Sequence, residues 1–284
     1  MSGFLKKVEQ DDSYTIPAVL FDGGTINVRM EEHEEAIEWC QRVLGLQITQ
    51  QENWTPGPDA VIGKMTHMGM GLWIESGRAA DGTPAPAVVR EPLDSTILWY
   101  WRTRNLRSTK QELHRQGVQT SENYTDHAGN EVFNFRFMNS GTWLSAIEDP
   151  SLDGDVFSDS NVTRIKVKHL RQSIEWYKQY LGMAVSAEPA MNSYCEMTLG
   201  INHHPEGRYI WMLAEDSNWT DHGPLDGLFR TRSFIADREA FFNYYQFLKD
   251  SGNLVSEMGG YVLRGRVYFH VYDPDGNRFD ISHC

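Results

Sequence analysis

A near-copy of one ten-residue segment constrains the fold of this chain more than any other feature of the sequence. The sequence IEWCQRVLGL occupies residues 37–46, and IEWYKQYLGM occupies residues 174–183, in a chain of 284 residues. The offset between the copies, 174 minus 37, is 137 residues and is therefore close to half the chain length. Because similarity at a fixed spacing indicates a repeat architecture, the two halves of the chain are predicted to share one plan.

Each copy belongs to a longer unit that begins with a strand. The runs over residues 25–30 and 163–168 alternate in character, which is typical of a half-buried strand. Within the copies, apolar residues recur at helical spacing, and Gly45 and Gly182 follow at positions suited to a left-handed helix end. The sequence therefore predicts a strand, a helix and then further strands in each unit.

Two weaker copies of the unit fill the rest of the chain. The second unit is predicted to contain a strand over 96–102, a helix over 109–116 that stops at Gly117, and a hairpin of 132–137 with 142–147. The fourth unit is predicted to contain a strand over 229–235, a helix over 239–248 with a stop at Gly252, and strands over 266–272 and 278–281. The sequence DPDGN at 273–277 joins the last two strands, because its proline, glycine and polar side chains all favour a turn.

The strand–helix–LG pattern, together with the terminal DPDGNRFDI, resembles the vicinal oxygen chelate superfamily of glyoxalases, bleomycin-resistance proteins and extradiol dioxygenases. The resemblance covers nearly the whole chain. It implies an α+β fold of four βαβββ units, paired into two glyoxalase-like domains with curved mixed sheets whose concave faces hold the ligand. We expect a polar N-terminal arm over 1–19, a first domain of two units over 20–151 and a second over 157–284.

The resemblance also implies where a metal would be held. Metal enzymes of the superfamily place His, Gln or Glu at the start of the first strand of each unit and Glu in the last strand. Carried over to this chain, the first-strand positions are Thr25, Leu98, Val162 and Arg230, and the last-strand positions are Glu75, Glu148, Leu213 and Asp280. No three-ligand set results, so we expect no metal cofactor. The alternative is a divalent metal held by Glu75 and Glu148, and salt bridges at these two glutamates are a further interpretation.

Basic side chains are expected on the concave faces instead. Alternation places Arg164 and Lys166 on the face opposite the more apolar Thr163, Ile165 and Val167, which would pack against the helix. By resemblance, Arg230 and Arg232 turn the same way in the fourth unit. Since arginine can bind a carboxylate or phosphate through two hydrogen bonds, these residues predict a site for an acidic or phenolate ligand. The alternative is internal ion pairing with nearby carboxylates: Asp280, Glu215 or Glu257.

Four further residues complete the predicted site. His270 and Asp280 are ten positions apart and in phase, so a neutral imidazole beside a carboxylate is the candidate for acid–base catalysis. In the first pair of units, Arg29 and Tyr100 fall on the ligand-binding face with Glu75. This face carries charges of both signs, and we expect these charges to pair with one another more than those of the second pair of units.

Composition limits the partners of the protein. The net charge of −13 argues against nucleic acid and anionic membranes, because both surfaces are negative. The three cysteines form no CxxC, and no apolar run has the length of a signal peptide or membrane span, so we expect a cytoplasmic protein with reduced thiols. A small molecule is the expected partner of a monomer or homodimer.

The sequence supports one function and one alternative. The first is binding of a small aromatic or anionic molecule in a concave sheet pocket, without the usual metal triad and with catalysis left open. The alternative is a metal-dependent lyase, isomerase or ring-cleaving dioxygenase of the same superfamily that uses Glu75 and Glu148. Motifs of other chemistries, such as GxSxG, the P-loop and HExxH, do not occur.

Overall fold

The computed structural model describes residues 14–54, 63–77, 97–138, 142–153, 157–187, 194–202, 204–219, 229–261 and 266–283. Most of the predicted N-terminal arm and the loop at 139–141 lie outside these residues. None of the described helices has the length and apolar composition that a membrane crossing requires.

The four predicted βαβββ units are confirmed. Unit one contains β1 (Leu20–Val28), α1 (His33–Trp39, continued by a short π-helical turn, Cys40–Leu44), β2 (Gln50–Trp54), β3 (Gly63–His67) and β4 (Leu72–Gly77). Unit two contains β5 (Ile97–Thr103), α2 (Leu106–Arg115), β6 (Tyr124–Thr125), β7 (Glu131–Arg136) and β8 (Trp143–Glu148). Unit three contains β9 (Ser158–Val167), α3 (Leu170–Leu181), β10 (Ala184–Ala187), β11 (Tyr194–Ile201) and β12 (His204–Glu215). Unit four contains β13 (Phe229–Phe234), α4 (Arg238–Asp250), β14 (Gly259–Tyr261), β15 (Arg266–Tyr272) and β16 (Arg278–His283).

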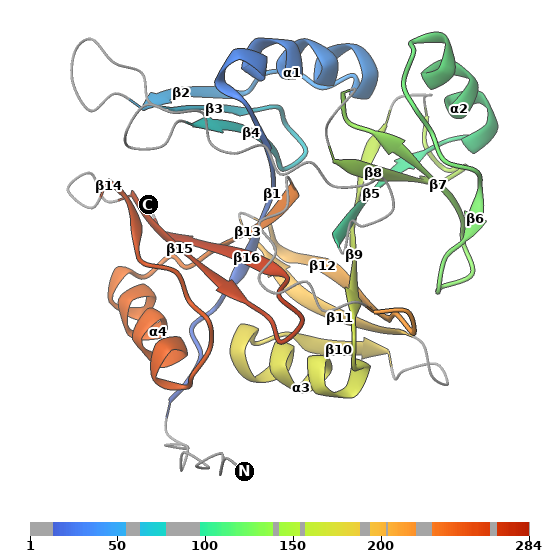
Figure 1. Ribbon diagram of the computed structural model, residues 1–284. Helices are drawn as coiled ribbons and strands as arrows, with labels where there is room; N and C mark the ends of the chain where they lie inside the picture. Colours follow the sequence, from blue (N-terminus) through green and yellow to red (C-terminus); the bar gives the residue numbers. More distant parts are fainter. Residues whose placement is uncertain are drawn as a thin grey trace.

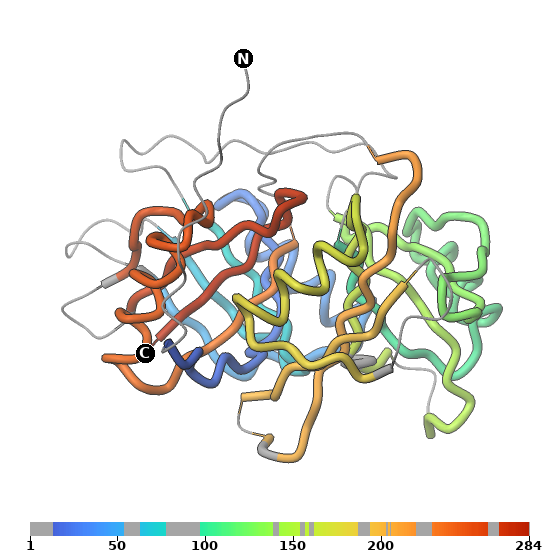
Figure 2. The backbone as a smooth tube through the Cα atoms, turned by 90° about the horizontal axis from the view of Figure 1, so that it is seen from below, coloured from blue at the N-terminus to red at the C-terminus, as the bar shows by residue number. Residues whose placement is uncertain are grey.

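The units pair through their first strands into two mixed sheets (Figures 1 and 2). In the first sheet β1 is antiparallel to β13, and the strand order is β2-β3-β4-β1-β13-β16-β15-β14. In the second sheet β5 is antiparallel to β9, and the order is β10-β11-β12-β9-β5-β8-β7-β6. The start of β1 also pairs with β11, so this strand joins the two sheets.

The pairing corrects the expected order of units. Chain order led us to expect unit one with unit two and unit three with unit four, but unit one pairs with unit four and unit two with unit three. The connection from β8 to β9 spans only residues 149–157, whereas that from β4 to β5 spans 78–96. Because a short connection favours neighbouring strands, unit three joins unit two, and unit four is left for unit one. Each sheet therefore draws strands from both of the ranges 20–151 and 157–284.

One face of each sheet is covered by helices. In Figure 1, α1 and α4 lie on the outer sides of the first sheet, and α2 and α3 lie on the outer sides of the second. We call the opposite face, which none of the described helices covers, the inner face. On β4 the alternation is regular, with buried Leu72 and Ile74 toward α1 and half-buried Trp73 and Glu75 on the inner face.

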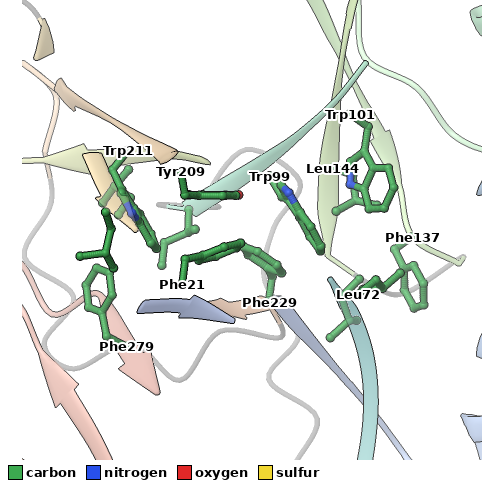
Figure 3. Packing of buried hydrophobic residues seen from close by; sticks show 14 of the residues in the cluster. Phe21, Leu72, Trp99, Trp101, Phe137, Leu144, Tyr209, Trp211, Phe229 and Phe279 are labelled. Carbon is green, nitrogen blue, oxygen red and sulfur yellow. The ribbon is translucent and has the colours of Figure 1, made fainter. Parts of the chain in front are cut away.

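Aromatic side chains fill the junction between the two sheets (Figure 3). Phe21 of β1 stacks on Tyr209 of β12 with ring centroids 3.5 Å apart, and Trp99 of β5 stacks on Phe229 of β13 at 5.3 Å. Burying an aromatic side chain of this kind contributes about 1.5–3 kcal/mol. This packing fixes the two sheets relative to each other and so positions both inner faces.

The predicted helix stops and the predicted turn are confirmed. Gly45 and Gly182 both adopt left-handed backbone, with φ of 70° and 67°. In the DPDGN turn, the buried carboxylate of Asp273 accepts hydrogen bonds from the backbone N–H groups of Asp275 and Asn277. The hydroxyl of Tyr177 on α3 donates to the same carboxylate at 2.7 Å, which ties the turn to unit three. Burial raises the pKa of Asp273 to about 6, although the hydrogen bonds favour its charged form.

Tyr177→Phe is expected to lower the free energy of unfolding by about 1.5–3 kcal/mol at pH 7.5, where Asp273 is ionised and its hydrogen bond is charge-assisted. Since the folded state holds the proton of Asp273 more tightly than the unfolded state, this carboxyl favours folding at low pH and loses that contribution as pH rises through about 6. The cost of Tyr177→Phe should therefore be smaller at pH 5. Urea denaturation at both pH values tests this, with Tyr180→Phe on the same helix as control. A cost independent of pH would contradict it.

Candidate functional site

The inner face of the first sheet carries a cluster of charged side chains. The guanidinium of Arg230, on β13, lies between two carboxylates, 3.3 Å from Glu75 on β4 and 3.4 Å from Asp280 on β16. The Arg230 side chain is only 7% exposed. Burial alone would raise the pKa of Asp280, yet Arg230 and Arg278 hold it well below its ordinary value. The structure therefore brings together three of the predicted site residues as a buried ion cluster.

His270 and Asp280 also lie together, as the sequence predicts. Nδ1 of His270 is 2.9 Å from Oδ1 of Asp280. Arg278, which sequence reasoning missed, donates from Nε to the same carboxylate oxygen at 2.7 Å, and its Nη2 lies 2.8 Å from Nε2 of His270. If Nδ1–H donates to Asp280, the lone pair on Nε2 accepts from Arg278 and is not available to take a proton. This geometry does not favour His270 as a general base.

Arg232 lies on the same inner face, where its guanidinium contacts other side chains of the protein. Its guanidinium lies 4.7 Å from the ring centroid of Trp73, 3.3 Å from the sulfur of Met65 and 4.0 Å from Asp22. A cation over an indole ring is a favourable arrangement. Arg230 and Arg232 of the first sheet thus contact internal protein groups, which is the alternative that the sequence left open, although Nε of Arg230 has no hydrogen-bond partner.

Arg29 does not reach the inner face. Its side chain is 48% exposed and pairs with Glu31 and Glu32 in the turn before α1. The expectation that Arg29 binds ligand beside Tyr100 is corrected, because β1 ends at Val28 and the chain turns outward there.

The second sheet carries the other two predicted basic residues. Lys166 of β9 is 3.0 Å from the carboxylate of Asp216. Arg164, two residues earlier on the same face, is only 8% exposed. Its Nε has no hydrogen-bond partner, and no ion pair of Arg164 occurs among the residues that the structure describes. The single basic site expected from sequence is therefore split, with Arg164 and Lys166 in one sheet and Arg230 and Arg232 in the other.

The cross-strand neighbours of Arg164 are apolar. In the strand register Arg164 lies opposite Leu98 of β5 on one side and Met212 of β12 on the other. The inner-face residues nearest to Arg164 on the two last strands are also uncharged: Trp143, Ser145 and Ile147 on β8, and Ile210 and Ala214 on β12. In contrast, the corresponding strands of the first sheet supply Glu75 and Asp280 to Arg230. Arg164 is thus a buried cation without the carboxylates that neutralise Arg230.

An apolar cluster and a polar network surround Arg164 on this face. Leu98, Tyr100, Val132 and Trp143 form a buried cluster. Burial, with smaller effects of neighbouring groups, raises the pKa of Tyr100, so its hydroxyl stays protonated at neutral pH. Beside this cluster, Oδ1 of Asn134 accepts hydrogen bonds from the hydroxyls of Tyr124 and Ser145, at 2.9 and 2.8 Å. Neither Asn134 nor Ser145 was singled out from sequence, although alternation along β7 and β8 could have placed both on this face.

The two glutamates of the metal hypothesis do not meet. Glu75 contacts Arg230 in the first sheet. Glu148, at the end of β8 in the second sheet, accepts a hydrogen bond from the backbone N–H of Leu106 at the first turn of α2, at 3.0 Å. Glu215 caps α3 in the same way through Leu170, at 2.9 Å. A carboxylate at a helix N-terminus is stabilised by the unpaired N–H groups there, so the role of Glu148 is structural.

The positions that hold a metal in the superfamily do not fit one in this chain. In the first sheet they carry Thr25, Glu75, Arg230 and Asp280, and the guanidinium supplies the positive charge between the two acids. In the second sheet Leu98 and Val162 offer no donor atoms, and the predicted partners Glu148 and Leu213 do not face inward. Among the described ranges, no group of three or more His, Cys, Asp or Glu side chains is arranged to hold a metal ion.

Comparison with known proteins agrees with this fold. Residues 160–281 match the family model of the Glyoxalase/Bleomycin resistance protein/Dioxygenase superfamily. The matched residues span units three and four, and the resemblance inferred from DPDGNRFDI is confirmed. No curated protein matches the chain.

Solved structures extend the likeness to the whole chain. Glyoxalase I from Zea mays superposes with a TM-score of 0.63 at 11% identity, covering 94% of this chain and 92% of the maize protein. A candidate dioxygenase from Bacillus subtilis gives a TM-score of 0.63 at 11% identity, covering 95% and 86% of the two chains. At this identity the likeness establishes the glyoxalase-like fold and leaves activity open.

Proposed function

We propose that this protein binds a small carboxylate on the inner face of its second sheet, with Arg164 as the anchor. The observation that supports the proposal most directly is the buried side chain of Arg164, whose Nε has no hydrogen-bond partner and which forms no ion pair among the described residues. Arginine is suited to bind a carboxylate through two parallel hydrogen bonds.

The energetics favour an anion at this position. A buried charge without a partner is strongly destabilising, and proteins normally pair it or hydrogen-bond it. Asp216 contacts Lys166 and is also within electrostatic reach of Arg164, so one carboxylate serves two cations and touches only Lys166 of the two. Partial burial and then the positive charge of Arg164 lower the pKa of His127, in the turn after β6, against the smaller opposing effect of Asp126 and Asp216, so this imidazole lies near Arg164. A ligand carboxylate would supply a counter-ion in direct contact with Arg164.

The metal-dependent alternative has less support. Glu75 and Glu148 have separate partners in different sheets, and the first-sheet cluster already contains its own cation. Ligand binding is therefore the function that the geometry supports best.

Isothermal titration calorimetry with acetate, benzoate and 2-naphthoate tests the proposal, with benzamide as the neutral counterpart of benzoate. We expect benzoate to bind and benzamide to bind far more weakly. Arg164→Met should weaken benzoate binding about 10- to 100-fold, because a hydrogen bond to a charged group is worth about 1.5–3 kcal/mol.

Arg29→Met is the matched control, since it removes the same charge from an exposed position outside the inner face. It should leave benzoate affinity unchanged. No binding by any of the three carboxylates, or equal affinities in the wild type and Arg164→Met, would refute the proposal.

A further inference from the structure

Two carboxylates face one point on the inner face of the first sheet, and a guanidinium lies between them. Oε2 of Glu75, on β4, is 3.3 Å from Nη2 of Arg230, and Oδ2 of Asp280, on β16, is 3.4 Å from Nη1 of the same side chain. A single cation therefore bridges the two acids. Its Nε has no hydrogen-bond partner among the described residues, so the cluster does not satisfy every donor of Arg230.

Thr25 adds a third oxygen beside this point. It lies directly opposite Arg230 in the register of β1 and β13, and the residue is completely buried. Oγ1 of Thr25 forms no hydrogen bond with any described group. Because buried hydroxyls normally have a partner, this oxygen is a polar atom that the ion cluster around Arg230 leaves unused.

The two oxygens of Asp280 have separate contacts. Oδ1 accepts a hydrogen bond from Nε of Arg278 at 2.7 Å and lies 2.9 Å from Nδ1 of His270. These contacts hold the carboxylate in place and leave Oδ2 directed at Arg230. Carboxylates that bind metals are fixed by neighbouring hydrogen bonds in the same way. The side chain of Glu75 is 22% exposed and can adjust its position.

The same residues stand at the positions that hold a metal in the superfamily. Thr25 and Arg230 lie on the first strands of units one and four, and Glu75 and Asp280 lie on their last strands. The sequence hypothesis combined Glu75 with Glu148, but the pairing of unit one with unit four brings Glu75 to Asp280 instead. The positive charge between these acids is therefore the guanidinium of Arg230.

We propose that the guanidinium of Arg230 replaces a divalent metal ion in the first sheet. It neutralises Glu75 and Asp280, and it keeps divalent cations out of a site whose oxygen atoms, including that of Thr25, are still in place. The native protein is closed to metal at this site, and loss of the guanidinium opens it. This proposal is independent of carboxylate binding at Arg164 in the second sheet.

Exchange of Arg230 for a metal-binding side chain tests the proposal, with Co²⁺ as the probe. In Arg230→His the imidazole joins Glu75 and Asp280, and such a set of ligands suits transition metals. The histidine side chain is shorter than that of arginine, so a metal about 2.1 Å from its nitrogen would lie near the place of the guanidinium. Equilibrium dialysis and visible absorption should show one Co²⁺ ion more in Arg230→His than in the wild type.

Thermal unfolding gives a second measurement of the same ion. At a Co²⁺ concentration about 100 times the dissociation constant, the unfolding midpoint of Arg230→His should rise by about 5 °C, and that of the wild type should not change. Because loss of the guanidinium leaves two acids close together, the variant is also refolded from urea with and without Co²⁺. Arg230→Gln, whose amide oxygen can bind a metal, is treated in parallel. Both variants should refold in higher yield with Co²⁺.

Double variants are the matched controls. Arg230→His combined with Glu75→Gln, or with Asp280→Asn, keeps the imidazole and the shape of the acid but removes one charged ligand. Each should bind Co²⁺ at least about 10-fold more weakly than Arg230→His alone, since a charged ligand contributes more than a neutral one.

Three results would overturn the proposal. The first is a wild-type protein that binds Co²⁺ as tightly as Arg230→His, because the guanidinium would then exclude nothing. The second is the absence of an additional ion from both Arg230→His and Arg230→Gln, whether purified directly or refolded with Co²⁺. The third is Co²⁺ binding that survives in both double variants, since the ion would then lie outside this cluster.

Discussion

Arg230→Met is expected to lower the free energy of unfolding by about 3–5 kcal/mol, whereas Arg164→Met should leave it unchanged or raise it. The two arginines are similarly buried, at 6% and 8% exposure, and both lie on the first strand of a unit. Their surroundings differ. Arg230 lies between Glu75 and Asp280, and Arg164 lies between Leu98 and Met212.

The loss at Arg230 comes from the carboxylates it leaves behind. Without the guanidinium, Glu75 and Asp280 are left close together on the inner face, and breaking a buried pair in this way costs far more than the pair itself contributes. At Arg164 the same substitution removes a charge that has no direct partner and replaces it with an apolar side chain of similar length. Its neighbours are apolar, so the new side chain extends an existing cluster.

The pH dependence of this prediction has a definite sign. Arg230 and Arg278 hold the pKa of Asp280 well below its unfolded value of about 3.9, so its contribution to stability is present above that pH and is lost as pH falls. The cost of Arg230→Met should therefore be largest near pH 7 and shrink toward pH 4, where Asp280, left with Arg278 as its one arginine partner among the described contacts, is protonated more readily than in the wild type. Urea denaturation of both variants between pH 4 and 7.5 measures it. Equal losses of unfolding free energy in Arg230→Met and Arg164→Met would contradict the conclusion that carboxylates contact Arg230 and not Arg164.

Local features of the fold were predictable because they depend on neighbouring residues. Helix ends at Gly45 and Gly182 and the DPDGN turn each follow from residues a few positions apart. The pairing of units was not predictable in the same way. All four first strands alternate alike, so their pattern does not identify the partner of each strand, and the chain-order expectation was wrong for both sheets.

The candidate site was predictable in part for the same reason. Alternation correctly places Arg164 and Lys166 on the inner face, because a shift of one residue would turn both toward α3. It does not show which strand lies opposite, and this decides whether an arginine meets a carboxylate. Arg278 lies two residues before Asp280 and therefore on the same face, a signal in the DPDGNRFDI segment that sequence reasoning passed over.

Gly23→Ala is expected to lower the free energy of unfolding by more than about 4 kcal/mol, an effect rare for so small a change. Gly23 lies at the irregularity of β1, between the residues that pair with β11 and those that pair with β4. Its φ of +101° is disfavoured for any other residue, and a Cβ atom there would lie 2.1 Å from the carbonyl oxygen of Gly71. That oxygen accepts a hydrogen bond from the backbone N–H of Gly24 at 2.9 Å. Moving the oxygen would break this hydrogen bond, which connects β1 to the turn before β4.

Gly129→Ala separates the two causes of this effect. Gly129 also has positive φ, +86°, but a Cβ atom there meets nothing within 4 Å, so only backbone strain of about 1–2 kcal/mol is expected. The additional loss of unfolding free energy in Gly23→Ala, compared with Gly129→Ala, measures the cost of the close approach to Gly71. Since β1 joins the two sheets through β11, this excess should appear as loss of the whole fold in one transition rather than fraying of unit one. Similar costs at the two glycines, or a separate transition for unit one, would show that the crossing at Gly23 does not hold the sheets together.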